Sequence, residues 1–230
     1  MTLLSRLLPA LLLCLACARG RPPVPILNYH SVGPGGDEFT VASEDFEHQL
    51  DFLVSAGLRT ASLDDLVQHR DVSRAVVLTF DDGTEDALTR VLPALRKRGM
   101  RATFFVITGL VGKPGYLSWD GVRALAAAGM EIGSHSVDHA HLADESDERV
   151  REELTASKRE LESQLHAPVE VLAYPYNSVR KRIERAAAEA GYRAAVAGAV
   201  HGGKGLLNLY RVTIRRSTGL DEFRRLALGG

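Results

Sequence analysis

Short apolar runs alternate with longer amphipathic segments from residue 24 to the C-terminus. The runs that predict strands cover residues 24–29, 75–80, 102–107, 131–134 and 169–174, with two more at 193–196 and 211–214. Apolar residues at helical spacing between them predict helices over 43–56, 88–98, 118–128, 150–165, 178–190 and 220–228. Alternation of strands and helices predicts a parallel sheet covered by helices.

The number of strand–helix units narrows the architecture. Seven or so units in about 210 residues favour a closed or nearly closed barrel over an open doubly wound sheet. Ser62 and Asp65 form the pattern of a capping box, and Ser43 and Ser118 are predicted N-caps. In either architecture, active-site residues gather at the carboxyl ends of the strands. The residues that follow each predicted strand are therefore the candidates for chemistry.

The first residues have the pattern of a secretory signal peptide. Arg6 precedes an apolar run that is too short to span a bilayer, and the run ends in Ala16-Cys17-Ala18, which fits the small-x-small cleavage rule. We therefore predict a signal peptide over 1–18, a short linker over 19–23 and one domain over 24–230. The protein would be exported to the periplasm, the cell surface or the medium. Lipidation of Cys17 would instead anchor it to a membrane.

Composition excludes several classes of function. Hydrophobic residues make up 45% of the chain and charged residues 25%, which is typical of a globular protein. The net charge of −1 leaves no basic field for general nucleic-acid binding. Both cysteines, Cys14 and Cys17, lie in the predicted signal peptide, so the exported chain would contain neither a disulfide nor a thiol nucleophile.

Two predicted strand ends carry residues that can hold a metal ion. TFDDG ends the strand at 75–80 and places Asp81 beside Asp82; SHSVDH follows the strand at 131–134 and contains His135 and His139. Histidines four apart share one face if the segment is helical. Two histidines and one carboxylate form a common catalytic metal site, and the second Asp is then free to accept a proton. The alternative for the Asp pair is a turn that caps the following helix.

Two other strand ends carry further candidate groups. His30 follows the first strand and is either a core histidine or a second proton-transfer group. In AYPYN, Pro175 forces the chain out of the sheet, and the backbone N–H of Tyr176 is a candidate oxyanion donor. The alternative is an aromatic turn that simply closes the strand.

Together, TFDDG, SHSVDH and AYPYN resemble the polysaccharide deacetylase family, which is carbohydrate esterase family 4 or the NodB-homology domain. Tyr29-His30 and the late LYRVTI resemble the branch that contains poly-β-1,6-N-acetylglucosamine deacetylases. The resemblance spans roughly residues 24–228 and makes 24–230 the catalytic domain. It implies an α/β fold, a distorted (β/α)7 barrel of the polysaccharide deacetylase type.

The resemblance also implies a role for each motif residue. Asp81 would be the catalytic base and His30 the catalytic acid, and the Tyr176 N–H would stabilise the oxyanion. One divalent ion, usually zinc, with nickel, cobalt or ferrous iron as alternatives, would be held by Asp82, His135 and His139. The further candidates for contacting the sugar are Trp119, Tyr174, Pro175 and Asn177; the alternative for Trp119 is a core residue.

Three positions depart from the family pattern. Many members carry, two residues before the motif proline, an arginine that pairs with the base, and this chain has Ala173 there. The partner of the base is therefore not identified from the sequence. Asn177 stands where glycine is usual, and asparagine tolerates the left-handed conformation. The late Leu-x-His motif is absent, which leaves His201 as the late candidate acid and favours His30.

The implied activity is that of a secreted, metal-dependent hydrolase. It would remove N-acetyl groups from a GlcNAc-containing polysaccharide and release acetate. The alternatives are an O-acetyl polysaccharide esterase and a glycan-binding domain with a decayed site. The predicted partner is an N-acetylated polysaccharide or oligosaccharide, with no nucleic acid, and with a membrane only if Cys17 is lipidated.

Overall fold

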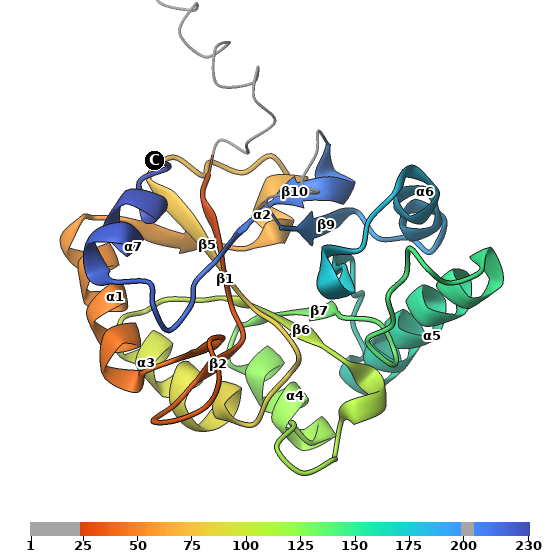
Figure 1. Ribbon diagram of the computed structural model, residues 1–230, viewed down its shortest axis with the longest axis horizontal. Coiled ribbons are helices and arrows are strands. Elements are labelled where there is room, and N and C mark those ends of the chain that lie inside the picture. The colour runs from red at the N-terminus through yellow and green to blue at the C-terminus, as the bar shows by residue number, and fades with distance from the viewer. Residues whose placement is uncertain (1–23, 199–204) are drawn as a thin grey trace, which may run out of the picture.

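The apolar strand residues form a parallel sheet that curves round on itself, as the computed structural model in Figure 1 shows. The structure describes residues 24–198 and 205–230; the predicted signal peptide, the linker and His201 lie outside the described residues. The strands in chain order are β1 (Ile26–Tyr29), β4 (Arg59–Ala61), β5 (Ala75–Phe80), β6 (Thr103–Val106), β7 (Glu131–Ser134), β8 (Val171–Ala173), β9 (Ala194–Ala197), β10 (Leu209–Tyr210) and β11 (Val212–Thr213). Their order in the sheet is β10-β9-β8-β7-β6-β5-β1-β11, and β4 pairs with β5.

One stretch of chain joins the two edges of this sheet. β10 and β11 are separated only by Arg211; Leu209 of β10 pairs with Val196 of β9, and Val212 of β11 pairs with Leu27 of β1. The eight strands of the path therefore occupy seven positions around a ring. This confirms the predicted distorted (β/α)7 barrel and excludes the open doubly wound sheet.

Helices surround the barrel on its outside (Figure 1). They are α1 (Ser43–Ser55), α3 (Leu92–Lys97), α4 (Trp119–Ala127), α5 (Asp147–Leu165), α6 (Lys181–Glu189) and α7 (Leu220–Ala227). The short helix α2 (Leu63–Val67) instead packs with residues that face the barrel interior. A small separate sheet pairs β2 (Ser31–Val32) with β3 (Thr40–Val41). Among the helices of the described ranges, none combines the length and the apolar character needed to cross a bilayer.

Side chains of each strand alternate between two apolar clusters, as the period of two requires. Ile26, Val77 and Phe105 pack in one cluster with residues of α2. Their neighbours Leu78 and Phe104 pack in another with residues of the outer helices. The first set therefore faces the barrel interior. Residues that continue its alternation past a strand end point into the mouth of the barrel.

Most predicted helix boundaries agree with the structure to within one residue, but α5 begins three residues before its predicted start and α6 three residues after it. Ser62 makes the predicted capping box with Asp65, and the Ser118 side chain caps α4. Ser43 is not a cap: it is already helical, and the carbonyl of Ala42 accepts the first helical hydrogen bond. The helix predicted over 88–98 is a π-helical segment (Ala87–Val91) followed by α3, and Pro93, which has no N–H to donate, lies at the junction.

Candidate active site

The carboxyl ends of the strands surround one pocket of about 320 Å³. It is lined by polar and aromatic side chains from six segments: Asn28, His30, Phe39, Asp81, Asp82, His135, His139, Tyr174, Tyr176, Asn177, Arg211, Thr213 and Arg215. Asn28 and Asp81 continue the inward-facing alternation of β1 and β5. The residues that follow different strands therefore meet in one pocket, as the sequence predicts.

Arg211 is the partner of the buried carboxylate of Asp81. Its Nη1 donates to Asp81 Oδ1 at 2.7 Å and its Nη2 to Asp81 Oδ2 at 2.6 Å, and both side chains are almost fully buried. Asn28 donates to Asp81 Oδ2 at 3.3 Å and accepts from Arg211 Nη1 at 2.8 Å. Arg211, which lies where the barrel closes, thus forms the ion pair with Asp81 that Ala173 cannot form.

The pair sets the protonation state of Asp81. Burial on its own would raise the pKa of this carboxyl, but the charge and hydrogen bonds of Arg211, with a contribution from His135, hold it well below its usual range. Asp81 is therefore ionised throughout the physiological range and available to accept a proton. The sequence offered one signal for this partner, which is a lone arginine inside the otherwise strand-like LYRVTI run.

Asp82, His135 and His139 form a group that can hold a metal ion. Each offers one ligand atom, and these atoms all lie within 4.8 Å of one another. Asp82 Oδ1 lies 3.5 Å from His135 Nε2 and 3.7 Å from His139 Nε2, and the two Nε2 atoms are 3.2 Å apart. Two imidazole nitrogens and a carboxylate oxygen suit zinc and similar divalent ions.

Unusual backbone conformations bring these three ligands together. Asp82 has a φ of 70°, and the Gly83 N–H donates to the Asp81 carbonyl at 2.9 Å, so the chain reverses between the two carboxylates. The sequence predicts that the two imidazoles share a face if the segment between His135 and His139 is helical. The segment is not helical. Positive φ values at Ser136 (65°) and His139 (59°) turn the loop back on itself instead.

The protonation states of these residues fit a metal ion. The Ala173 carbonyl lies 2.8 Å from His135 Nδ1, so a proton on Nδ1 leaves the Nε2 lone pair free to coordinate. Burial lowers the pKa of His135 to about 4 and also lowers that of His139, so both imidazoles are neutral at pH 7. Burial and the neighbouring Asp81 charge raise the pKa of Asp82 to about 6.

The pKa of Asp82 makes metal affinity depend on pH. Because this pKa is raised, Asp82 holds a proton at pH 5 that a metal ion must displace, whereas it is largely ionised at pH 7. We expect the affinity for Zn²⁺ to be nearly constant above pH 7 and to fall about tenfold per pH unit below pH 6. Competition with a chromophoric chelator, corrected for the chelator's own protonation, measures this. Equal affinities at pH 5 and pH 7 would contradict it.

His30 is a second group beside the Asp81 carboxylate, which Arg211 also contacts. Its Nε2 is 3.9 Å from Asp81 Oδ2, and its ring packs against Phe39 with the ring centroids 4.8 Å apart. The His30 side chain is 24% exposed. It is therefore a pocket residue rather than a core histidine.

The AYPYN segment supplies one wall of the pocket. Tyr176 and Asn177 both have left-handed backbone conformations, with φ values of 53° and 54°. The Tyr176 ring is 55% exposed and stacks on the ring of His141 at 3.7 Å. Asn177 Oδ1 accepts a hydrogen bond from the Gly198 N–H at 2.5 Å, so the asparagine both tolerates the conformation and ties the segment to the end of β9.

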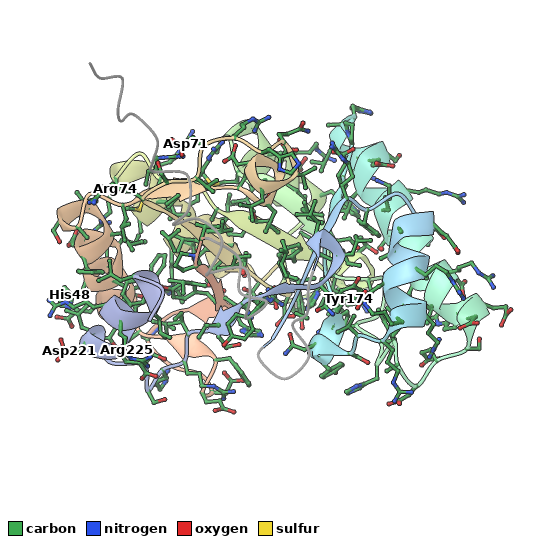
Figure 2. The ribbon with its side chains drawn as sticks, turned by 90° about the horizontal axis from the view of Figure 1, so that it is seen from above. His48, Asp71, Arg74, Tyr174, Asp221 and Arg225 are labelled. Carbon is green, nitrogen blue, oxygen red and sulfur yellow. The ribbon has the colours of Figure 1, made fainter. Side chains whose placement is uncertain are left out.

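The remaining predicted sugar contacts divide into pocket and core residues. Tyr174 lines the pocket but is fully buried, and its hydroxyl donates to the Leu207 carbonyl at 2.9 Å. Figure 2 shows Tyr174 among the strands, whereas the other labelled residues lie at the periphery of the molecule. Trp119 and Pro175 are not among the described residues that line the pocket. Trp119 packs at the start of α4 against the core.

Comparison with known proteins shows the family to which the sequence and the fold belong. A model of the polysaccharide deacetylase family matches residues 69–195. YxkH of Bacillus subtilis (strain 168), whose name also refers to that family, is 30% identical over 199 residues, which are 83% of this chain and 71% of that protein. The structure of the Streptococcus pyogenes deacetylase PplD in complex with acetate superposes with a TM-score of 0.82 at 25% identity, covering 89% of this chain and 97% of that one.

Two further relatives carry the name of a substrate. The peptidoglycan-N-acetylglucosamine deacetylase of Bacillus cereus is 31% identical over 52% of this chain and 54% of that protein. The poly-beta-1,6-N-acetyl-D-glucosamine N-deacetylase of Staphylococcus aureus is 24% identical over 60% of this chain and 54% of that protein. The chain therefore spans about half the length of these two relatives.

Proposed function

Because the chain belongs to the polysaccharide deacetylase family, we propose that it is an exported, metal-dependent hydrolase that removes N-acetyl groups from a GlcNAc-containing polysaccharide. The observation that carries this proposal is the Asp81–Arg211 pair beside the Asp82, His135 and His139 group in one pocket. An ionised carboxylate next to a group of metal ligands suits hydrolysis of an acyl bond. The predicted signal peptide supports export.

The side chains divide the steps of amide hydrolysis among them. A divalent ion held by Asp82, His135 and His139 would polarise the acyl carbonyl and lower the pKa of a water molecule. Asp81 accepts a proton from the attacking water as the water oxygen bonds to the carbonyl carbon, and the Tyr176 N–H donates to the oxyanion. His30 donates a proton to the nitrogen as the C–N bond breaks. The products are acetate and a free amino sugar.

The substrate class rests on the named relatives and on the pocket walls. Both relatives named for a substrate act on polymers of N-acetylglucosamine or on peptidoglycan that contains it. The exposed Tyr176 ring and Asn177 at the pocket edge offer an apolar face and an amide, which suit a sugar ring.

Acetate release by the metal-loaded protein tests the proposal. We expect release from poly-β-1,6-N-acetylglucosamine or from peptidoglycan, with loss of activity on adding a chelator and recovery on adding Zn²⁺. Acetylated xylan tests the O-acetyl esterase alternative in parallel. Stoichiometric metal binding without acetate release from any of these substrates would favour a decayed glycan-binding domain.

The role of His30 predicts a dependence on the leaving group. The H30Q variant should lose about 100-fold or more of its kcat/KM on an N-acetyl sugar, because the amine leaves only when protonated. On 4-nitrophenyl acetate, whose leaving group needs no proton, the same variant should lose much less. Steady-state kinetics on both substrates check this. Equal losses on the two substrates would rule out His30 as the acid.

A further inference from the structure

The segment from His135 to His139, here called the histidine loop, is held in place by groups outside it. It is irregular, yet it places two Nε2 atoms 3.2 Å apart. Two neighbouring amides, those of Thr108 and Gly109, donate to the carbonyls of Ser136 and Val137 at 3.2 and 2.9 Å. These bonds hold the carbonyl groups of the loop but not its N–H groups.

The N–H groups in the middle of the histidine loop bind a buried carboxylate. Glu153 of α5 is 0% exposed, and its Oε2 accepts from the Val137 N–H at 2.8 Å and from the Asp138 N–H at 3.0 Å. Val137 and Asp138 lie between the two metal-ligand histidines. A carboxylate removed from water is costly unless it is paired and hydrogen-bonded, so this position has a specific requirement for its partners.

Arg149 balances the charge of Glu153 and extends the same contact. It lies one turn earlier on α5, and its Nη2 is 2.5 Å from Glu153 Oε1 and 2.6 Å from Asp138 Oδ2. Further along the helix, Ser157 Oγ lies 2.8 Å from Ser134 Oγ, which in turn accepts from the Ser136 N–H at 3.2 Å. Helix α5 therefore contacts the middle of the histidine loop and also Ser134, the residue that precedes the loop.

We infer that Glu153 is a positioning residue for the metal site, because its carboxylate fixes the backbone that presents both histidines to Asp82. A loop already fixed in this shape loses less conformational freedom when the ion binds. Groups that orient the ligands of a metal commonly contribute 10- to 100-fold to its affinity. The inference rests on the proposed metal site and adds to it a residue that contacts neither metal nor substrate.

The E153Q variant of the full chain tests this role. The glutamine oxygen can accept from the loop N–H groups only if its NH₂ group faces the Arg149 guanidinium. The variant therefore loses either its hydrogen bonds to the loop or its contact with Arg149. E131Q is the matched control: Glu131 is a half-buried carboxylate that also accepts two backbone N–H bonds, from Leu63 at 3.0 Å and Asp64 at 2.9 Å, but it lies at the other end of β7.

The readouts are the Zn²⁺ dissociation constant by chelator competition, the visible absorption of the Co²⁺-loaded protein, and the thermal midpoint. We expect E153Q to weaken Zn²⁺ binding at least tenfold and to alter the Co²⁺ bands. E131Q should lower the thermal midpoint and leave both metal readouts unchanged. If E153Q does not fold, E153D keeps the charge but is too short to reach both amides, and the same weakening is expected.

The outcomes separate this inference from the proposed function. Wild-type protein that binds no metal would overturn both the metal site and the role of Glu153. Wild-type protein that binds Zn²⁺, with unchanged affinity in the folded Glu153 variants, would overturn the role of Glu153 alone. An equal loss of affinity in E131Q would also overturn it, because the effect would then be one of general destabilisation.

Discussion

Replacing Asp81 with asparagine is expected to reduce kcat/KM for acetate release by about 100- to 10,000-fold, which is the usual contribution of a positioned base. The amide cannot accept the proton of the attacking water. Its oxygen can still accept a hydrogen bond from Arg211, while its NH₂ group faces another donor, so one hydrogen bond of the pair is lost. Bound Zn²⁺ should stay at the wild-type stoichiometry. Acetate assays and metal analysis on the same preparation measure both quantities.

The matched control for this variant is D82N. It removes a carboxylate of the same size from the adjacent position, and we expect it to lose metal as well as activity. Loss of metal from D81N, or retention of metal by D82N, would show that the two aspartates have been assigned the wrong way round.

Replacing Arg211 with methionine should have the largest effect on stability. It leaves the buried Asp81 carboxylate without its countercharge, and breaking such a pair costs about 3–5 kcal/mol in the free energy of unfolding. Urea unfolding at pH 7 measures this change. R225M is the control, since Arg225 is an exposed residue of α7 (labelled in Figure 2) whose pair with Glu222 should contribute less than about 1 kcal/mol.

The same R211M variant should shift the pH dependence of activity. Arg211 is what holds the pKa of Asp81 low against the opposing effect of burial, so the pKa of this carboxyl must rise when the guanidinium is removed. The acidic limb of the kcat/KM profile should therefore move to higher pH. The double variant D81N/R211M should be more stable than R211M, because a neutral amide needs no countercharge. An unshifted profile together with unchanged stability would contradict the proposed pairing.

Much of the barrel and of the pocket followed from local sequence patterns. The strand at 131–134 was predicted with its observed bounds, and the strand-end rule correctly grouped Asp81, Asp82, His135 and His139. These predictions succeed because a buried parallel strand is a short apolar run, and because the alternation of side chains continues past its end.

The contacts that were missed depend on long-range geometry. Arg211 lies 130 residues from Asp81 in the chain, and no local pattern specifies which arginine meets a given carboxylate. The sequence predicts only a helix at the position of Glu153, because the burial of this side chain depends on how α5 packs on the histidine loop. The short pairing of β10 and β11 with opposite edges of the sheet is likewise set by ring closure rather than by propensity.

Arg211 connects the closure of the barrel with the charge balance of the pocket. Arg211, which pairs with the buried Asp81 carboxylate, is also the single residue between β10 and β11, the two short strands that join the edges of the sheet. A chain that ended before residue 209 would still contain TFDDG, SHSVDH and AYPYN, so a search for these three motifs would still identify it. It would nevertheless have an unclosed sheet and a buried carboxylate without a countercharge. We therefore expect the proposed hydrolysis to require the stretch from β10 to β11 as well as the three motifs.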